Sequence, residues 1–327
     1  MNRIIPKKLK KGDEVRIIAP SRSINMLSEE TIETATKRLE DLGLIVTFGK
    51  NVNKVFNEEY GCASIEDRVS DLHDAFKDKN VKAILTVIGG FNINQLLDYI
   101  DYDLIKNNPK IICGYSDITA LTNAIYAKTG LVTYSGPVYS SFGMKKGFEY
   151  TLDYFKKMFF EDEDIEITSS DSWSDDAWYI DQENRTFNKN EGMTVINGGY
   201  AEGTIVGGNL CTLNLLQGTE YMPELNNTIL FIEDDDLVGD EYIREFDRDF
   251  VSLLQCYKGK KLNGIVVGRA QINSKMNIDK WKILFKNKNL KDIPIIINAN
   301  FGHTFPMITF PIGGTVVINN GKIVIKK

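Results

Sequence analysis

The feature that most constrains the fold is a run of apolar residues, Val81–Ile88, that ends in the pair Gly89-Gly90. A short apolar run without polar alternation, bounded by glycines, is typical of a parallel strand that is buried on both faces. Such a strand needs helices on both sides of its sheet. Amphipathic helical patterns precede the run at Glu29–Leu42 and after Ser64, which is a good N-cap residue.

Strand and helix patterns alternate through the whole first half of the chain. Further strands are expected at Glu14–Ile18, Ile45–Phe48 and Ile111–Cys113, and further helices at Ile93–Ile100 and Ile118–Ala127. This alternation predicts an α/β domain built on a doubly wound, mostly parallel sheet.

The alternation of strand and helix patterns stops between about residues 161 and 199, where Asp, Glu, Ser and Asn are frequent. Strand patterns dominate beyond it, and the turn Asn319-Asn320-Gly321 predicts a final hairpin. We therefore expect an N-terminal α/β domain at residues 1–165, a linker and active-site loop at 166–199, and a β-rich, mixed α+β domain at 200–327. The strands expected there are Gly203–Val206, Thr228–Ile232, Gly264–Val267, Ile295–Asn298 and the hairpin Thr315–Ile325, with helices at Asn209–Leu216 and Tyr242–Cys256.

Charge and cysteine content narrow the class of protein. The 327 residues carry a net charge of −6, and the only local basic cluster, residues 7–11, is interpreted as a solvated edge, so binding to nucleic acid is not expected. Four scattered cysteines without a CxxC pair argue against disulfides. The N-terminus shows no apolar core of a signal peptide, and no apolar run reaches the roughly 18 residues of a membrane span. A cytoplasmic location is expected.

Ser116 is the first candidate for chemistry. It lies between the predicted strand Ile111–Cys113 and a helix that begins at Ile118, and Gly114 permits the sharp turn. This junction places a serine at the carboxyl edge of the sheet, beside the backbone N–H groups of a helix N-terminus. The alternative is that Ser116 or Asp117 merely caps that helix.

His303 and Glu233 are candidates for the other two members of a catalytic triad. The chain has only two histidines, and His73 is expected to be structural on a helix face. His303 lies in a loop marked by glycine and proline, where a general base or a packed loop histidine are both possible. Glu233 ends a buried strand, from which it could orient a histidine. It also opens the acidic run through Asp236, which could instead bind a divalent metal or be a solvated loop.

These segments together resemble the serine LD-carboxypeptidase family, including its microcin C immunity branch. The resemblance covers most of the chain and rests on these motifs in order: Gly89-Gly90, Gly114-Tyr115-Ser116-Asp117, Gly207-Gly208-Asn209-Leu210, Phe231-Ile232-Glu233-Asp234, Gly302-His303-Thr304 and Pro311-Ile312-Gly313. It implies a triad of Ser116, Glu233 and His303, and an oxyanion hole at Gly90 and Asp117. It also implies no metal, no cofactor, a homodimer, and a site in the cleft between the two domains.

Two substrate classes compete within that family: murein tetrapeptides, and the amide that joins an acyl-amino acid to a nucleotide-like group. Trp178-Tyr179 followed by Asn184-Arg185 resembles the loop of the immunity branch, which favours a peptidyl-nucleotide. We expect Trp178 to be exposed on a mobile loop and to stack on a nucleobase, unless it anchors the linker. The family motif also suggests Asn209 as a substrate-binding residue. A non-enzymatic ligand-binding protein and a metal phosphohydrolase remain as alternatives.

Overall fold

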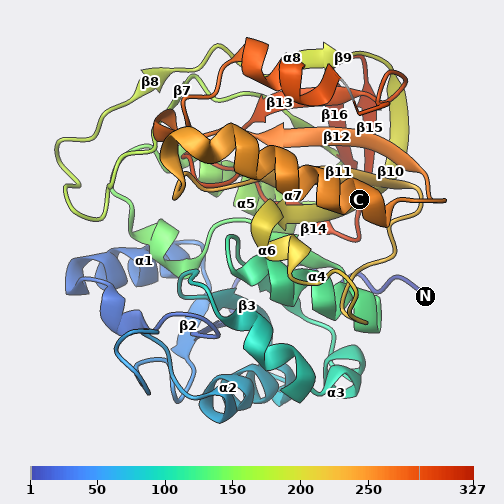
Figure 1. The fold of residues 1–327 in the computed structure, drawn as a ribbon. Coiled ribbons are helices and arrows are strands. Elements are labelled where there is room, and N and C mark those ends of the chain that lie inside the picture. Colours follow the sequence, from blue (N-terminus) through green and yellow to red (C-terminus); the bar gives the residue numbers. More distant parts are fainter. Residues whose placement is uncertain (1, 287) are drawn as a thin grey trace.

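The computed structural model describes residues 2–286 and 288–327, whose strands form two large sheets and one small one (Figure 1). The first large sheet has the order β14-β5-β4-β3-β1-β2, and its strands are parallel except for β14. The strand predicted from the apolar run lies inside this sheet as β3, with every residue but Lys82 buried. The bounds are β1 Glu14–Ile18, β2 Ile45–Phe48, β3 Val81–Thr86, β4 Ile111–Cys113, β5 Thr133–Ser135 and β14 Phe310–Ile312.

Helices α1, α2 and α4 lie where the sequence patterns place them, whereas α3 and α5 were not predicted. The Ser64 hydroxyl accepts a hydrogen bond from the Asp67 amide and caps α2, as predicted. The expected helix Ile93–Ile100 is a 3-10 segment, Ile93–Tyr99. The α-helices of this half are α1 Glu29–Asp41, α2 Ile65–Lys77, α3 Tyr102–Asn107, α4 Ile118–Thr129 and α5 Glu149–Phe160.

The second large sheet has the order β6-β16-β15-β10-β11-β12-β13-β9, with parallel pairing from β10 to β13 and antiparallel pairing at both edges. The expected hairpin is present as β15 and β16. The remaining bounds are β6 Ile165–Ile167, β9 Thr194–Asn197, β10 Tyr200–Asn209, β11 Thr228–Glu233, β12 Leu262–Gly268, β13 Ile295–Ala299, β15 Thr315–Asn319 and β16 Lys322–Lys326, with helices α6 Leu210–Asn214, α7 Tyr242–Cys256 and α8 Ile278–Lys286.

The two halves meet along α4, which is buried on almost every face (Figure 1). The Asn123 side chain donates to the Gly207 carbonyl at 2.8 Å, and the Asn209 amide donates to the Thr119 hydroxyl at 3.0 Å. The same helix begins at Ile118, two residues after Ser116, so it links the nucleophile candidate to the second sheet. The fold is therefore the predicted α/β domain followed by a mixed α+β half.

The segment 166–199 contributes strands to the structure. Its ends lie in β6 and β9, which form the two edges of the second sheet, and its middle forms the small sheet of β7 (Ser172–Trp173) and β8 (Asn188–Lys189). The domain division at residues 165 and 199 stays a prediction. Among the described residues, no helix combines the length and apolar character needed to cross a membrane.

Candidate active site

Ser116 adopts the strained conformation expected of a nucleophile at a strand-turn-helix junction. Its φ is +63°, in the left-handed region that residues other than glycine rarely occupy. Gly89, after β3, makes room for it, since a Cβ there would lie 3.0 Å from the Ser116 Cβ and 3.1 Å from its Oγ. The turn thus presents the hydroxyl at the carboxyl edge of the first sheet, as predicted.

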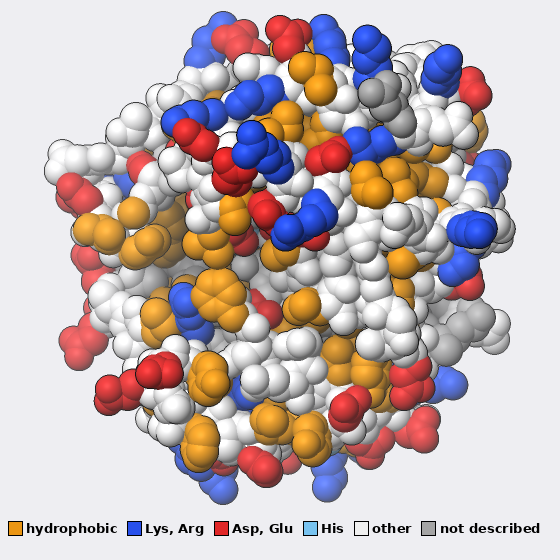
Figure 2. All heavy atoms as spheres, viewed as in Figure 1, with side chains coloured by type: hydrophobic (Ala, Val, Ile, Leu, Met, Phe, Trp, Pro, Cys, Tyr) orange, Lys and Arg blue, Asp and Glu red, His pale blue; other side chains and the backbone are white. Residues whose placement is uncertain are grey.

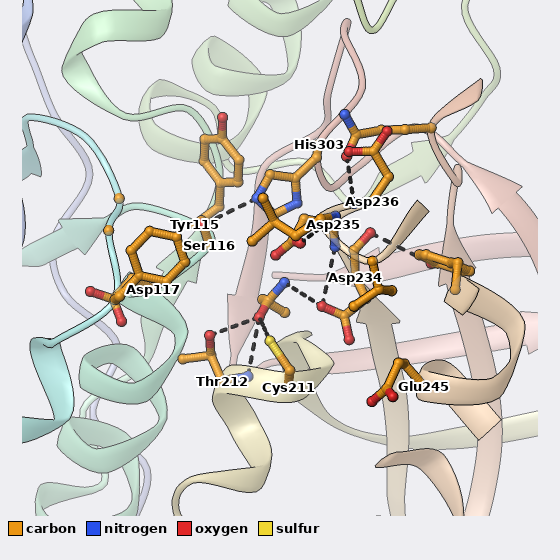
Figure 3. Close-up of a pocket in the computed structure, with 18 of the residues that line it drawn as sticks. Tyr115, Ser116, Asp117, Cys211, Thr212, Asp234, Asp235, Asp236, Glu245 and His303 are labelled. Carbon is orange, nitrogen blue, oxygen red and sulfur yellow. Dashed lines mark hydrogen bonds between the residues drawn. The ribbon is translucent and has the colours of Figure 1, made fainter. Parts of the chain in front are cut away.

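The structure brings the three triad candidates into one hydrogen-bonded chain, of which Figure 3 shows Ser116 and His303. His303 Nε2 lies 3.0 Å from Ser116 Oγ, and His303 Nδ1 lies 2.8 Å from Glu233 Oε2. The Glu233 side chain is 3% exposed and that of His303 is 19% exposed, so the carboxylate is shielded while the imidazole reaches the surface of the cleft. This is the order of groups that nucleophilic acyl transfer requires.

Two glycines make room for the Glu233 carboxylate. A Cβ on Gly302, whose φ is +102°, would lie 2.6 Å from Glu233 Oε2, and a Cβ on Gly268 would lie 2.7 Å from Glu233 Cβ. Glu233 ends β11, Gly268 ends the neighbouring β12, and Gly302 precedes His303. The glycine of the Gly302-His303 motif therefore has a steric reason: it lets the histidine loop lie against the carboxylate.

The electrostatics of the site favour a charged His303. Burial opposes the imidazolium, but the Glu233 carboxylate, followed by Asp235 and Asp234, outweighs burial and raises the pKa of His303 to about 9. Burial, together with repulsion from Glu233 and Asp235, raises the pKa of Asp234 to about 7. The acidic run therefore acts on the triad through its field as well as through the direct bond of Glu233.

Gly90 and Asp117, whose amides are expected to form an oxyanion hole, line the same cleft as Ser116. The Asp117 carboxylate makes no capping bond to α4. It accepts hydrogen bonds from Ser21 Oγ at 2.6 Å, from the Asn92 amide at 3.0 Å and from the Ile93 amide at 3.1 Å. These bonds tie the loop after Gly90 to the nucleophile turn. Within the described residues, neither the Gly90 nor the Asp117 amide donates to a protein acceptor.

Ser116 and His303 line a cavity of about 610 Å³ between the two halves, where the space-filling view shows a hollowed surface with hydrophobic side chains around it (Figure 2). One wall is acidic and belongs to the second half: Asp234, Asp235, Asp236, Glu245 and Asp249. Across from it, Arg22 is the one Lys or Arg side chain among the described lining residues, and its guanidinium lies 5.1 Å from the centre of the Phe91 ring. The cleft therefore offers opposite charges to the two ends of a bound molecule.

Asn209 lines the cleft, as expected, but it is buried and hydrogen-bonded to protein. Its Nδ2 donates to Asp234 Oδ1 at 3.0 Å, and its Oδ1 caps α6 by accepting from the Thr212 amide at 3.1 Å. These bonds fix the wall of the cleft. A direct contact between Asn209 and substrate stays a prediction.

The expectation that Trp178 is exposed on a mobile loop is wrong. Its side chain is 6% exposed, belongs to a hydrophobic core, and packs edge-to-face against Phe305 with ring centres 6.5 Å apart. The neighbouring Tyr179 is 67% exposed and lines the cleft. Sequence reasoning missed Tyr179, although its position beside Trp178 in the same motif was the available signal.

The metal alternative rests on a different set of side chains from the one expected. Ligand atoms of Cys211, Asp234 and Asp235 lie within 4.8 Å of one another, whereas Glu233 bonds to His303. Asp234 already accepts a hydrogen bond from Asn209. The acidic run is thus divided: Glu233 bonds to His303, whereas Asp234, Asp235 and Asp236 line the cleft.

Comparison with known proteins agrees with this geometry. Residues 15–136 match the LD-carboxypeptidase N-terminal domain, and residues 202–318 match the LD-carboxypeptidase C-terminal domain. The putative carboxypeptidase YocD of Bacillus subtilis is 56% identical over 94% of this chain and 94% of its own length. A probable murein peptide carboxypeptidase of the same organism is 33% identical over 97% of this chain and 92% of its own length.

Solved structures give the same assignment. An MccF-like protein from Bacillus anthracis str. Ames is 52% identical, with a TM-score of 0.96 over 99% of both chains. The microcin C7 self-immunity protein MccF, known from Escherichia coli, was solved in complex with aspartyl sulfamoyl adenosine. It is 31% identical, with a TM-score of 0.88 over 99% of this chain and 98% of that chain. The chain therefore belongs to the LD-carboxypeptidase family, and it is a serine-type carboxypeptidase.

Proposed function

We propose that this enzyme cleaves the amide bond of a peptidyl- or aminoacyl-nucleotide of the microcin C type, as a self-immunity or detoxification activity. The observation that carries the proposal is the pair of hydrogen bonds that joins Ser116, His303 and Glu233 at the floor of the cleft. A non-enzymatic ligand-binding protein would have no use for a strained serine bonded to a histidine that a buried carboxylate orients.

In the proposed mechanism, Ser116 Oγ attacks the carbonyl carbon of the scissile amide while His303 Nε2 accepts the hydroxyl proton. The amides of Gly90 and Asp117 bind the oxyanion of the tetrahedral intermediate. His303 then donates its proton to the departing nitrogen, which leaves an acyl-enzyme. Water, deprotonated by His303, cleaves the ester and restores Ser116. Glu233 holds the ring and stabilises the imidazolium at both stages.

The nucleotide-bearing substrate is favoured by the exposed aromatic group at the cleft. Tyr179 lines the cavity with most of its side chain exposed, and an exposed aromatic ring is suited to stacking on a nucleobase. The MccF relative was solved with an aminoacyl nucleotide analogue, a compound of the same chemical class.

A murein tetrapeptide is the second candidate, and Arg22 is the observation that favours it. Within the described residues, Arg22 has no carboxylate within 4.0 Å, although it lines the cleft. An unpaired guanidinium there could bind the terminal carboxylate of a peptide. The relative named a probable murein peptide carboxypeptidase gives this reading further weight.

The two substrates can be compared directly by measuring kcat/KM for aspartyl sulfamoyl adenosine and for a murein tetrapeptide. The proposal expects the larger value for the nucleotide analogue, no loss on adding a chelator, and inactivation by a serine-directed reagent. A larger value for the tetrapeptide would replace the proposed substrate. Activity that a chelator abolishes and a serine reagent leaves intact would overturn the mechanism. A homodimer is also proposed, and light scattering of the purified protein tests it.

A further inference from the structure

A second cavity, of about 620 Å³, adjoins the catalytic cleft. Gln271 lines both cavities, while Trp173, Arg269, Trp281 and Asn298 line the second one alone. Arg269 directly follows Gly268, the glycine that packs against Glu233. The second cavity therefore lies at the same carboxyl edge of the sheet as the triad acid.

Arg269 is a buried cation without a counter-ion. The residue is 8% exposed, and burial alone lowers its pKa to about 10. Within the described residues, no carboxylate lies within 4.0 Å of it, and its buried Nε has no hydrogen-bond partner. Its Nη2 donates to the Asn190 side chain and to the Asn298 carbonyl, both neutral acceptors. A guanidinium in such a place is poorly compensated until an anion binds.

The rest of the lining supplies hydrogen-bond donors and apolar surface. The indole N–H of Trp281 and the side-chain amide of Asn298 donate to no residue that the structure describes. Trp173 stacks on the Arg269 guanidinium, which lies 4.9 Å from the ring centre. Asp279, at the start of α8, is the one carboxylate in the lining as described. The balance of groups suits an anion that carries an apolar or aromatic body.

We propose that this cavity is an anion subsite, in which Arg269 binds a carboxylate or phosphate group while the ligand's apolar part lies against Trp173 and Trp281. Because Gln271 is common to both cavities, we assign the anion to the distal end of a substrate whose scissile amide lies at Ser116. That assignment rests on the proposed function, whereas anion binding by Arg269 does not.

A purely structural role for Arg269 is the competing explanation. Through Trp173 and Asn190, the same side chain fastens the small sheet of β7 and β8 to the second half. Arg269→Met keeps much of the length and the packing but removes the charge. Arg269→Lys keeps the charge but loses the planar fork that matches carboxylate and phosphate oxygens.

The binding test uses phenyl phosphate as the probe and calorimetry on the Ser116→Ala background, so that turnover plays no part. We expect Arg269→Met to weaken binding at least about 10-fold and Arg269→Lys to recover part of the loss. Arg22→Met is the matched control, because it removes the other unpaired cation near the triad. Unchanged binding in Arg269→Met, or a loss confined to Arg22→Met, would overturn the proposal. So would a lowered melting temperature in Arg269→Met with no change in affinity.

Kinetics on the enzyme with Ser116 intact show whether the anion is part of the substrate or a separate ligand. Two results together support the substrate assignment. Phenyl phosphate should inhibit competitively, and Arg269→Met should raise KM without changing kcat, but only for substrates with a distal anion. Non-competitive inhibition that disappears in Arg269→Met supports the site but assigns it to a free anionic ligand. Failure of the proposed substrate alone would leave the calorimetric result standing.

Discussion

The proposed triad and the segment 166–199 lie next to each other, but their structures are determined in different ways. Ser116 and Glu233 each stand at the end of a buried strand, and His303 follows another, so short apolar runs in the sequence already place them at one sheet edge. The segment 166–199 takes its shape from distant residues. Ser174 exchanges two backbone hydrogen bonds with Phe305, at 2.7 and 2.8 Å, only two residues beyond His303.

The polar composition of the segment does not show which of its charged side chains are buried. The Arg185 side chain is 1% exposed and donates to Asp176 at 2.6 Å. Polar composition predicts exposure only when the polar groups have no partners of their own. The comparison teaches that strand ends can be located from local patterns, whereas the burial of a charged side chain such as Arg185 depends on pairings that a local pattern does not contain.

The largest effect is expected at Ser116, where replacement of one hydroxyl should change the rate without changing the fold. Ser116→Ala should lower kcat by about 10⁴–10⁶. The Cβ is retained, so the positive φ at this turn gains no new strain and the melting temperature should stay close to that of the wild type. Measuring turnover and a thermal melt on the same variant checks both the expected loss of rate and the expected unchanged stability. Near wild-type activity in this variant would remove Ser116 from the mechanism.

The next effect concerns the link between Glu233 and His303. His303 must be neutral to act as the base. Because its pKa is about 9, activity should fall as the pH drops below 9, and about 1% of His303 is neutral at pH 7. Glu233→Gln should lower the maximal rate by about 10⁴ and move the limb of the pH profile toward 6.5. The deficit of the variant at pH 7 should therefore be about 10²-fold smaller than at pH 10.

The control for this profile is the second histidine. His73 Nε2 accepts a hydrogen bond from the Asp101 amide at 2.9 Å, and the residue lies outside the lining of the cleft. His73→Ala should keep the wild-type profile of kcat/KM against pH. The assigned roles would be contradicted if the limb of the pH profile moved in His73→Ala, or if it did not move in Glu233→Gln.

The same contrast explains how far the sequence predicted the fold. Long periodic helices with a capping serine were predicted best: α1 was predicted within one residue at each end, and the start of α2 after Ser64 was predicted correctly. Helix α5 was missed, since Phe148 precedes it and gives no capping signal. Strands β5 and β14 were also missed. Each has only three residues, too few to show a periodic pattern, and their antiparallel pairing joins distant parts of the chain.

In the candidate site, too, some residues could be located from local patterns and others could not. The positions of the triad residues followed from strand ends and from motifs, because each lies within a few residues of a strong local signal. Arg269 was missed, since nothing in its neighbouring residues indicates a buried cation without a counter-ion. Tyr179 was missed because the motif that it shares with Trp178 does not show which of the two rings faces the cleft.

Trp178 offers a way to test whether the segment is part of the core. Trp178→Ala should cost about 3–5 kcal/mol of unfolding free energy, because a buried tryptophan leaves a large cavity and loses its contact with Phe305. Chemical denaturation at neutral pH measures the loss. A change below about 1 kcal/mol, combined with a raised KM for a nucleotide substrate, would restore the interpretation of Trp178 as an exposed stacking residue.

Tyr179 should show the smallest effect, and on binding alone. Because the ring is largely exposed, Tyr179→Ala should barely change the melting temperature. Should the ring stack on a nucleobase, its loss should cost about 1–3 kcal/mol of binding, seen as a higher KM for aspartyl sulfamoyl adenosine with kcat unchanged. Tyr179→Phe should retain the affinity, because stacking needs the ring and not the hydroxyl. Tyr99→Ala serves as the matched control, since Tyr99 is 60% exposed and lies outside the cleft lining. An equal rise in KM for a murein tetrapeptide, which has no base to stack, would mean that Tyr179 only shapes the cleft and does not select a nucleotide.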